Sequence, residues 1–247
     1  MSKRLGAVAA VLLAAGSVAG AQTNTFSSGT SYTSPSITGF ATTSSQMAGM
    51  LVSWRFTGSA TVFSSAWGNL AGDFFGVSGS NGFRLRMGTG TSTFVTDWEL
   101  RNSSTQSLDF IQMRGAPGRT LFDCGWTGTA CVQNGQTTGG GLEGTISSAD
   151  GWSHQRTGGT FTGTVLGAYS NSVGIGTNPD VGDLFESLLI TFQGGMGAGK
   201  TYEFRADTDS SLPTADIPTP TVPEPSTYLL MGTGLVGLFS LRRKLKA

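Results

Sequence analysis

The chain of 247 residues has few charged side chains, and several residue types are nearly missing from it. Charged residues make up 12% of the sequence, and there are only one histidine and two cysteines. Once the two unusual ends are set aside, residues 22–223 carry nine basic and fourteen acidic residues, and Lys200 is the only lysine among them. A nucleic-acid-binding surface needs clustered basic residues. We therefore expect no nucleic acid partner.

The body between residues 22 and 211 also lacks any stretch of about twelve residues with the period of an amphipathic helix. Its apolar residues instead alternate with polar ones, as in strands with one buried face. Clusters of glycine, serine, threonine and asparagine separate these segments, as turns require. The sequence predicts an all-β body, an antiparallel sandwich or jelly roll. The clearest alternating segments are residues 52–56, 83–87, 94–100, 188–192 and 202–206.

Residues 194–201 read GGMGAGKT and match the G-x-x-x-x-G-K-[ST] pattern of phosphate-binding loops. Such a loop holds phosphate at the N-terminus of the helix that follows it. Here the following residues, TYEFRA, alternate as a strand does, and an apolar strand-like segment comes before the glycines. We interpret the motif as the turn of a β-hairpin in which glycines supply positive φ angles. We predict no nucleotide partner and no cofactor.

The first 21 residues differ from the body. Lys3 and Arg4 precede a short apolar run that ends in the small residues Ala19-Gly20-Ala21. A basic start, a short apolar core and an A-x-A ending are typical of a secretory signal peptide. Residues 1–21 are therefore predicted to direct export and to be removed, which leaves Gln22 first.

The C-terminal end is unusual as well. Five of the eight prolines lie in the segment SLPTADIPTPTVPEP, which favours an extended spacer at residues 212–222. An uncharged apolar helix is predicted at residues 226–241, and a basic cluster with Arg242, Arg243 and Lys244 follows it. The helix is short for the roughly 30 Å core of a bilayer. Because basic flanks stay cytoplasmic, we expect a transmembrane orientation that leaves the body outside.

The sequence Pro223-Glu224-Pro225, followed by an apolar helix and a short basic end, resembles the PEP-CTERM sorting signal over residues 223–247. The resemblance implies export across the inner membrane of a Gram-negative bacterium. It also implies a membrane-tethered intermediate on which an exosortase-type membrane protease acts at the Pro-Glu-Pro segment. The resemblance also implies an association with the cell surface and with exopolysaccharide production, so an extracellular polysaccharide is a further expected partner.

No motif of a catalytic nucleophile accompanies His154, which lies in a polar stretch and is expected on a surface loop. Asp97 and Glu99 share a strand face, about 7 Å apart, which is compatible with the paired carboxylates of a glycosidase. Outward acidic pairs are nevertheless common on solvated strands. Asp207 and Asp209 alternate as calcium ligands do, but the full ligand set is missing, and a polar strand end is the simpler interpretation. We expect no catalytic and no metal site.

Three functions stay open. The first is a non-catalytic protein of the cell surface or extracellular matrix, which the two targeting segments favour. The second is a carbohydrate-binding module, with or without calcium, that uses the turn residues Trp126 and Trp152. The third and least favoured is a secreted glycoside hydrolase with a carboxylate pair.

Cys124 and Cys131 are close in sequence, and export places them in an oxidising compartment, so we predict a disulfide between them. Loop-closure theory gives such a bond about 2–2.5 kcal/mol of stabilisation. Alkylation of the exported protein without reductant, followed by mass spectrometry, should leave both cysteines unlabelled. Reduction before alkylation should label both. Two labelled cysteines in the unreduced sample would contradict the prediction.

Overall fold

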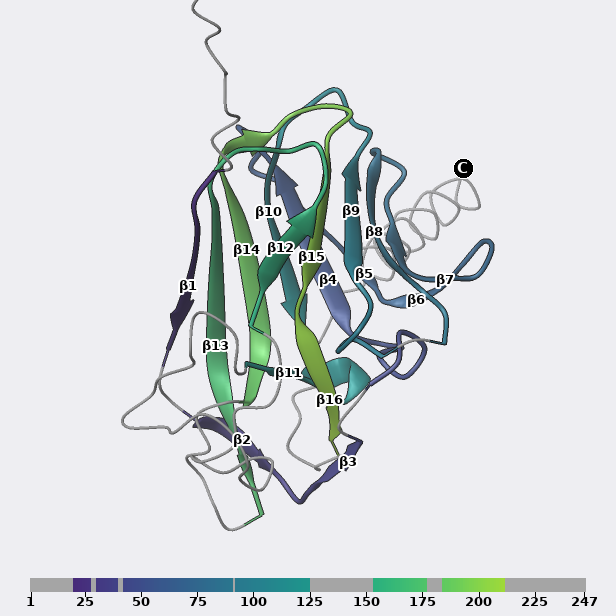
Figure 1. Cartoon of the computed structure of the whole chain (residues 1–247), viewed down its shortest axis with the longest axis vertical. Helices are drawn as coiled ribbons and strands as arrows, with labels where there is room; N and C mark the ends of the chain where they lie inside the picture. Colours follow the sequence, from purple (N-terminus) through teal and green to yellow (C-terminus); the bar gives the residue numbers. More distant parts are fainter. Residues whose placement is uncertain are drawn as a thin grey trace, which may run out of the picture. The chain divides into compact units, whose positions relative to one another are not determined.

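The computed structural model describes residues 20–27, 30–39, 42–90, 92–124, 153–176 and 184–211 (Figure 1). All of them belong to the first of two units of the chain, residues 1–217. Within the described residues the regular structure is strand, apart from one short 3-10 helix, η1 (Ala116–Gly118). The all-β prediction is confirmed.

The larger of two sheets is built around β14. This strand pairs antiparallel with β13 on one side and with β10 on the other. Its first residues pair with β11, which leads on to β16 and β3. Both β1 and β2 pair with β13 in parallel, a departure from the expected antiparallel arrangement. The ten strands are β1 (Gln22–Phe26), β2 (Thr30–Ser34), β3 (Ile37–Gly39), β4 (Leu51–Phe56), β5 (Val62–Ala66), β10 (Leu108–Arg114), β11 (Thr120–Asp123), β13 (Val165–Ile175), β14 (Leu184–Met196) and β16 (Asp207–Ser211).

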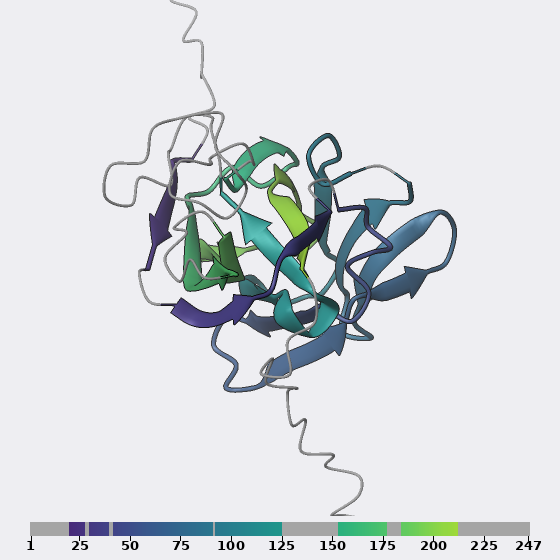
Figure 2. The same ribbon diagram turned by 90° about the horizontal axis from the view of Figure 1, so that it is seen from below.

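The smaller sheet has six strands, and every pair in it is antiparallel. Figure 2 turns the molecule by 90° and shows both sheets from below. The order across the smaller sheet is β12 (Gln155–Gly158), β15 (Thr201–Arg205), β9 (Trp98–Asn102), β8 (Phe83–Gly88), β7 (Phe74–Ser78) and β6 (Gly68–Leu70).

The two sheets face each other through a layer of aromatic side chains. Trp54 of β4 stacks on Phe83 of β8 with ring centroids 4.3 Å apart and planes 7° from parallel. Phe192 of β14 meets the ring of Tyr202 of β15 edge-on at 5.5 Å. All four side chains are buried. Because aromatic pairs add to the burial of apolar area, this layer holds the predicted sandwich together.

Alternating burial follows the predicted period of two in most strands. Strand β8 alternates between buried and partly exposed residues along its length, and so does β4. The prediction is wrong at Phe94, which we expected on the apolar face of a strand over residues 94–100. Strand β9 begins only at Trp98, and Phe94 lies in the preceding turn with 39% of its surface exposed.

The glycine-rich segment 194–201 is a turn, but the hairpin prediction is wrong. Strand β15 follows the turn directly, so no helix starts after Lys200. The strands before and after it belong to different sheets, however. Gly194 and Gly195 adopt φ angles of +77° and +81°, and the register between β10 and β14 shifts at this point. Pairing with β10 resumes at Met196, opposite Leu108, and the chain then crosses to the other sheet.

The predicted spacer at residues 212–222, the sorting segment at residues 223–247 with its apolar helix 226–241, and residues 1–19 of the predicted signal peptide lie outside the described residues. Its last two residues, Gly20 and Ala21, continue the pairing of β1 toward Thr162 and Val165. Over the part of the chain that the structure describes, no helix has the length and apolarity needed to span a bilayer.

We predict that replacing Trp54 with alanine lowers the free energy of unfolding by about 3–5 kcal/mol, the usual cost of truncating a buried aromatic side chain. Urea unfolding of the exported protein measures the change. Val62→Ala on the neighbouring strand β5 is the matched control, because Val62 is 52% exposed and should cost about 0.5 kcal/mol or less. Equal costs for the two variants would contradict the packing described above.

Candidate functional site

His154 is buried, contrary to the predicted surface loop, and only 1% of its surface is exposed. Its Nε2 lies 2.9 Å from the hydroxyl oxygen of Tyr202. Its backbone N–H donates to the hydroxyl of Tyr169 at 2.6 Å. The polar residues beside it in sequence suggested exposure, but the hydroxyls that enclose His154 come from strands β13 and β15, later in the chain.

Strand β1 completes this enclosure. This strand pairs with β13. Gln22 and Asn24 are two residues apart, so their side chains project from the same face of β1, and both reach His154. The His154 Nδ1 lies 3.1 Å from Asn24 Oδ1 and 3.2 Å from Gln22 Nε2. Both side-chain amides also donate to the His154 carbonyl oxygen. Every polar atom of His154 therefore has a partner inside the fold.

Burial lowers the pKa of His154 to about 3, and burial also raises the pKa of Tyr169 and of Tyr202 above the ordinary tyrosine value. The imidazole is therefore neutral at physiological pH. A general base must come within hydrogen-bonding distance of its substrate. An enclosed imidazole is not available for that role in this conformation, so the network acts as a polar element of the core.

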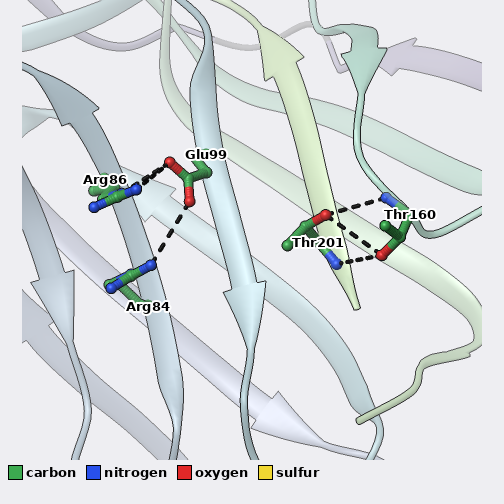
Figure 3. A network of polar contacts seen from close by, with 5 residues as sticks. All are labelled: Arg84, Arg86, Glu99, Thr160 and Thr201. Atoms are coloured by element: carbon green, nitrogen blue, oxygen red, sulfur yellow. Dashed lines mark hydrogen bonds and ion pairs between the residues drawn. The ribbon is translucent and has the colours of Figure 1, made fainter. Parts of the chain in front are cut away.

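The acidic pair considered for hydrolysis is occupied by arginines. The Nε and Nη2 of Arg86 both donate to Glu99 Oε2, at 2.8 and 2.6 Å (Figure 3). Arg84 Nη2 lies 3.7 Å from the other Glu99 oxygen. Asp97 is paired with Arg205 at 3.2 Å. Each carboxylate thus has its own cationic partner on the sheet.

Residues 207–211 form the polar strand β16, as the sequence suggested, but this strand is buried. It lies between β11 and β3, and Asp207 and Asp209 are 2% and 1% exposed. Asp207 Oδ1 accepts hydrogen bonds from Thr93 Oγ1 at 2.7 Å and from the backbone N–H of Thr208 at 2.9 Å. The described residues contain no group of three or more histidine, cysteine and acidic side chains placed to hold a metal. The segment DTDSS has no apolar residue from which its burial could have been predicted.

A hollow of about 250 Å³ opens on the outer face of the smaller sheet, over β6, β7 and β8. Between the lining residues Phe74 and Ser78 of β7 lies Gly76, where an added Cβ would lie 2.1 Å from the carbonyl oxygen of Leu85 and 3.0 Å from the Leu70 side chain. The Arg86 guanidinium lies 3.8 Å above the centre of the Phe74 ring. The alternation of residues 83–87 predicted a polar outer face here but no site. The lining residues are Leu70, Ala71, Phe74, Ser78, Arg84 and Arg86.

Most of the other predicted site residues lie outside the described residues. Cys124 is buried at the end of β11, and its predicted partner Cys131 lies in a segment that is not described, so the disulfide stays a prediction. Trp126 and Trp152 lie in the same segment. The remaining residues outside the described ranges are Pro223, Glu224, Pro225, Arg242, Arg243 and Lys244.

Comparison with protein families gives one match, between residues 221–244 and the PEP-CTERM protein-sorting motif. The chain carries a PEP-CTERM sorting motif. The matched range contains the Pro-Glu-Pro segment and the basic cluster on which the sequence prediction rested. The motif implies export in a Gram-negative bacterium, a membrane-anchored sorting intermediate and processing by exosortase. Neither the curated proteins nor the solved structures gave a match to the chain.

We predict that this protein loses stability as the pH falls from about 7 to about 5, partly because of His154. In the unfolded chain the histidine protonates near its ordinary pKa of about 6.5, whereas in the folded protein it stays neutral down to about 3. The unfolded state therefore binds the extra proton, which weakens folding by up to about 1.4 kcal/mol per pH unit. Urea unfolding of wild-type protein and His154→Gln at several pH values should give a steeper loss in the wild type. Parallel curves would show that His154 titrates normally in the fold.

Proposed function

We propose that this PEP-CTERM protein is a non-catalytic component of the cell surface or extracellular matrix. In this proposal the tail tethers the exported chain to the membrane, exosortase acts near Pro223–Pro225, and the β-sandwich reaches the surface or the medium. The observation that carries the proposal is the match of residues 221–244 to the sorting motif.

The body supports a structural or binding role over a hydrolytic one. Its histidine is enclosed by tyrosines and amides. The outward acidic pair considered for glycoside hydrolysis is held by arginines. Those contacts lower the availability of the groups that acid–base catalysis would use.

A second candidate is the carbohydrate-binding module. The favouring observation is the hollow on an open sheet face, with arginines and the Phe74 ring at its walls. This site differs from the one that the sequence suggested, which relied on Trp126 and Trp152.

The processing step can be tested by replacing Pro223 and Pro225 with alanine in the full chain. We predict that the double variant accumulates in the membrane fraction with its tail attached, because the segment on which exosortase acts is altered. The wild-type protein should appear at the surface or in the medium with a new C-terminus near Pro223–Pro225, as measured by fractionation and mass spectrometry.

Pro218→Ala with Pro220→Ala is the matched control, because these prolines lie in the spacer just before the sorting segment and outside the matched range of residues 221–244. This control should be processed like the wild type. Normal release of the Pro223/Pro225 variant, or an intact tail on wild-type protein at its destination, would overturn the proposed processing.

A further inference from the structure

Two arginines stand directly opposite each other on the outer face of the smaller sheet. The register of β8 and β9 pairs Arg84 with Arg101. The same row across the sheet continues from Arg84 to Ser78 of β7 and from Arg101 to Thr201 of β15. Like charges directly opposite in a sheet are destabilising. The row therefore carries an uncompensated cost unless an anion lies against it.

The protein supplies only part of that compensation. Glu99 lies in the neighbouring row and is bound through two nitrogens by Arg86 (Figure 3). Arg84 reaches Glu99 only at 3.7 Å, and its Nε is buried without a hydrogen-bond partner. Arg101 is exposed and forms no ion pair within the described part of the chain. Two guanidinium groups thus keep free donors beside two carboxylates. Glu99 is already engaged by Arg86, and Glu203, which stands opposite Glu99 in the neighbouring row, forms no ion pair with Arg84 or Arg101 within the described residues.

The surroundings of the row show which kind of anion fits. Arg84 and Ser78 both line the hollow, whose other walls include Leu70 and Phe74. A volume of about 250 Å³ is below the ~300–1,000 Å³ of pockets that enclose drug-sized ligands. The hollow lies on an open sheet face, so one ring of a longer chain fits better than a free multi-ring molecule. At the far end of the row, the Thr201 hydroxyl is bonded to the N–H of Thr160 (Figure 3).

We propose that this face binds an acidic polysaccharide that carries uronate carboxylates. The carboxylate of one sugar lies between Arg84 and Arg101 and accepts charge-assisted hydrogen bonds. The ring of that sugar occupies the hollow against Leu70 and Phe74, and the chain continues across the sheet. The expectation that the protein meets such a polysaccharide rests on the proposed surface role. The binding itself is argued from the row of arginines alone.

The test measures binding of polygalacturonate to the mature protein recovered from producing cells, by isothermal titration calorimetry. We predict that Arg84→Gln and Arg101→Gln each weaken binding about tenfold, the equivalent of one charge-assisted contact. Arg55→Gln is the matched control: Arg55 lies on β4 in the other sheet, where it is paired with Asp109. It removes the same charge and should leave binding unchanged. Binding should also weaken as salt is raised.

Thermal unfolding distinguishes a binding defect from a folding defect. Arg101→Gln should unfold at the wild-type temperature or above it, because the like-charged pair is gone. Failure of the wild type to bind, an equal loss in Arg55→Gln, or equal binding of neutral dextran would overturn the proposal. Equally tight binding of poly-L-glutamate would overturn the sugar assignment. None of these outcomes bears on export and processing, which the tail variants test separately.

Discussion

The structure depends on the packing of one aromatic sheet face against another. Trp54 lies flat on Phe83, and Phe192 meets Tyr202, so each contact joins the larger sheet to the smaller one. Successive residues of a strand point to opposite faces. Once Phe83 and Leu85 face the interior, Arg84 and Arg86 must face outward. The packing that stabilises the fold thus also determines which side chains form the outer surface of the smaller sheet.

The same constraint explains how far the sequence could predict the fold. Strands with alternating apolar residues, such as β4 and β8, were predicted because their own residues specify which face is buried. Strand β16 contains no apolar residue, and it is buried because it lies between β11 and β3 and its side chains contact Thr93 and Met47. Asp207 is satisfied by Thr93, which is 114 residues away in sequence. Burial that depends on partners so distant leaves no local pattern.

The candidate sites differ in the same way: some are formed by consecutive residues, and others by residues distant in sequence. The sorting motif is a linear signal, and so the residues of the match could be predicted directly from the sequence. The environment of His154 is three-dimensional, because it needs amides from β1 and hydroxyls from β13 and β15. The glycines of residues 194–201 identify a turn by their positive φ angles, but a turn alone does not specify which sheet receives the next strand.

The choice of basic residue fits a surface that recognises carboxylates. Eight of the nine basic residues between residues 22 and 223 are arginines, and arginine binds planar carboxylates through several donors and stacks on aromatic rings, which lysine does less well. Four arginines already pair closely with carboxylates of this chain, as Arg86 does with Glu99. Arg84 and Arg101 have the same chemistry without an equally close partner. Two adjacent arginines, of which only Arg84 reaches a carboxylate and only at 3.7 Å, cost stability for the fold, and an external carboxylate would offset that cost.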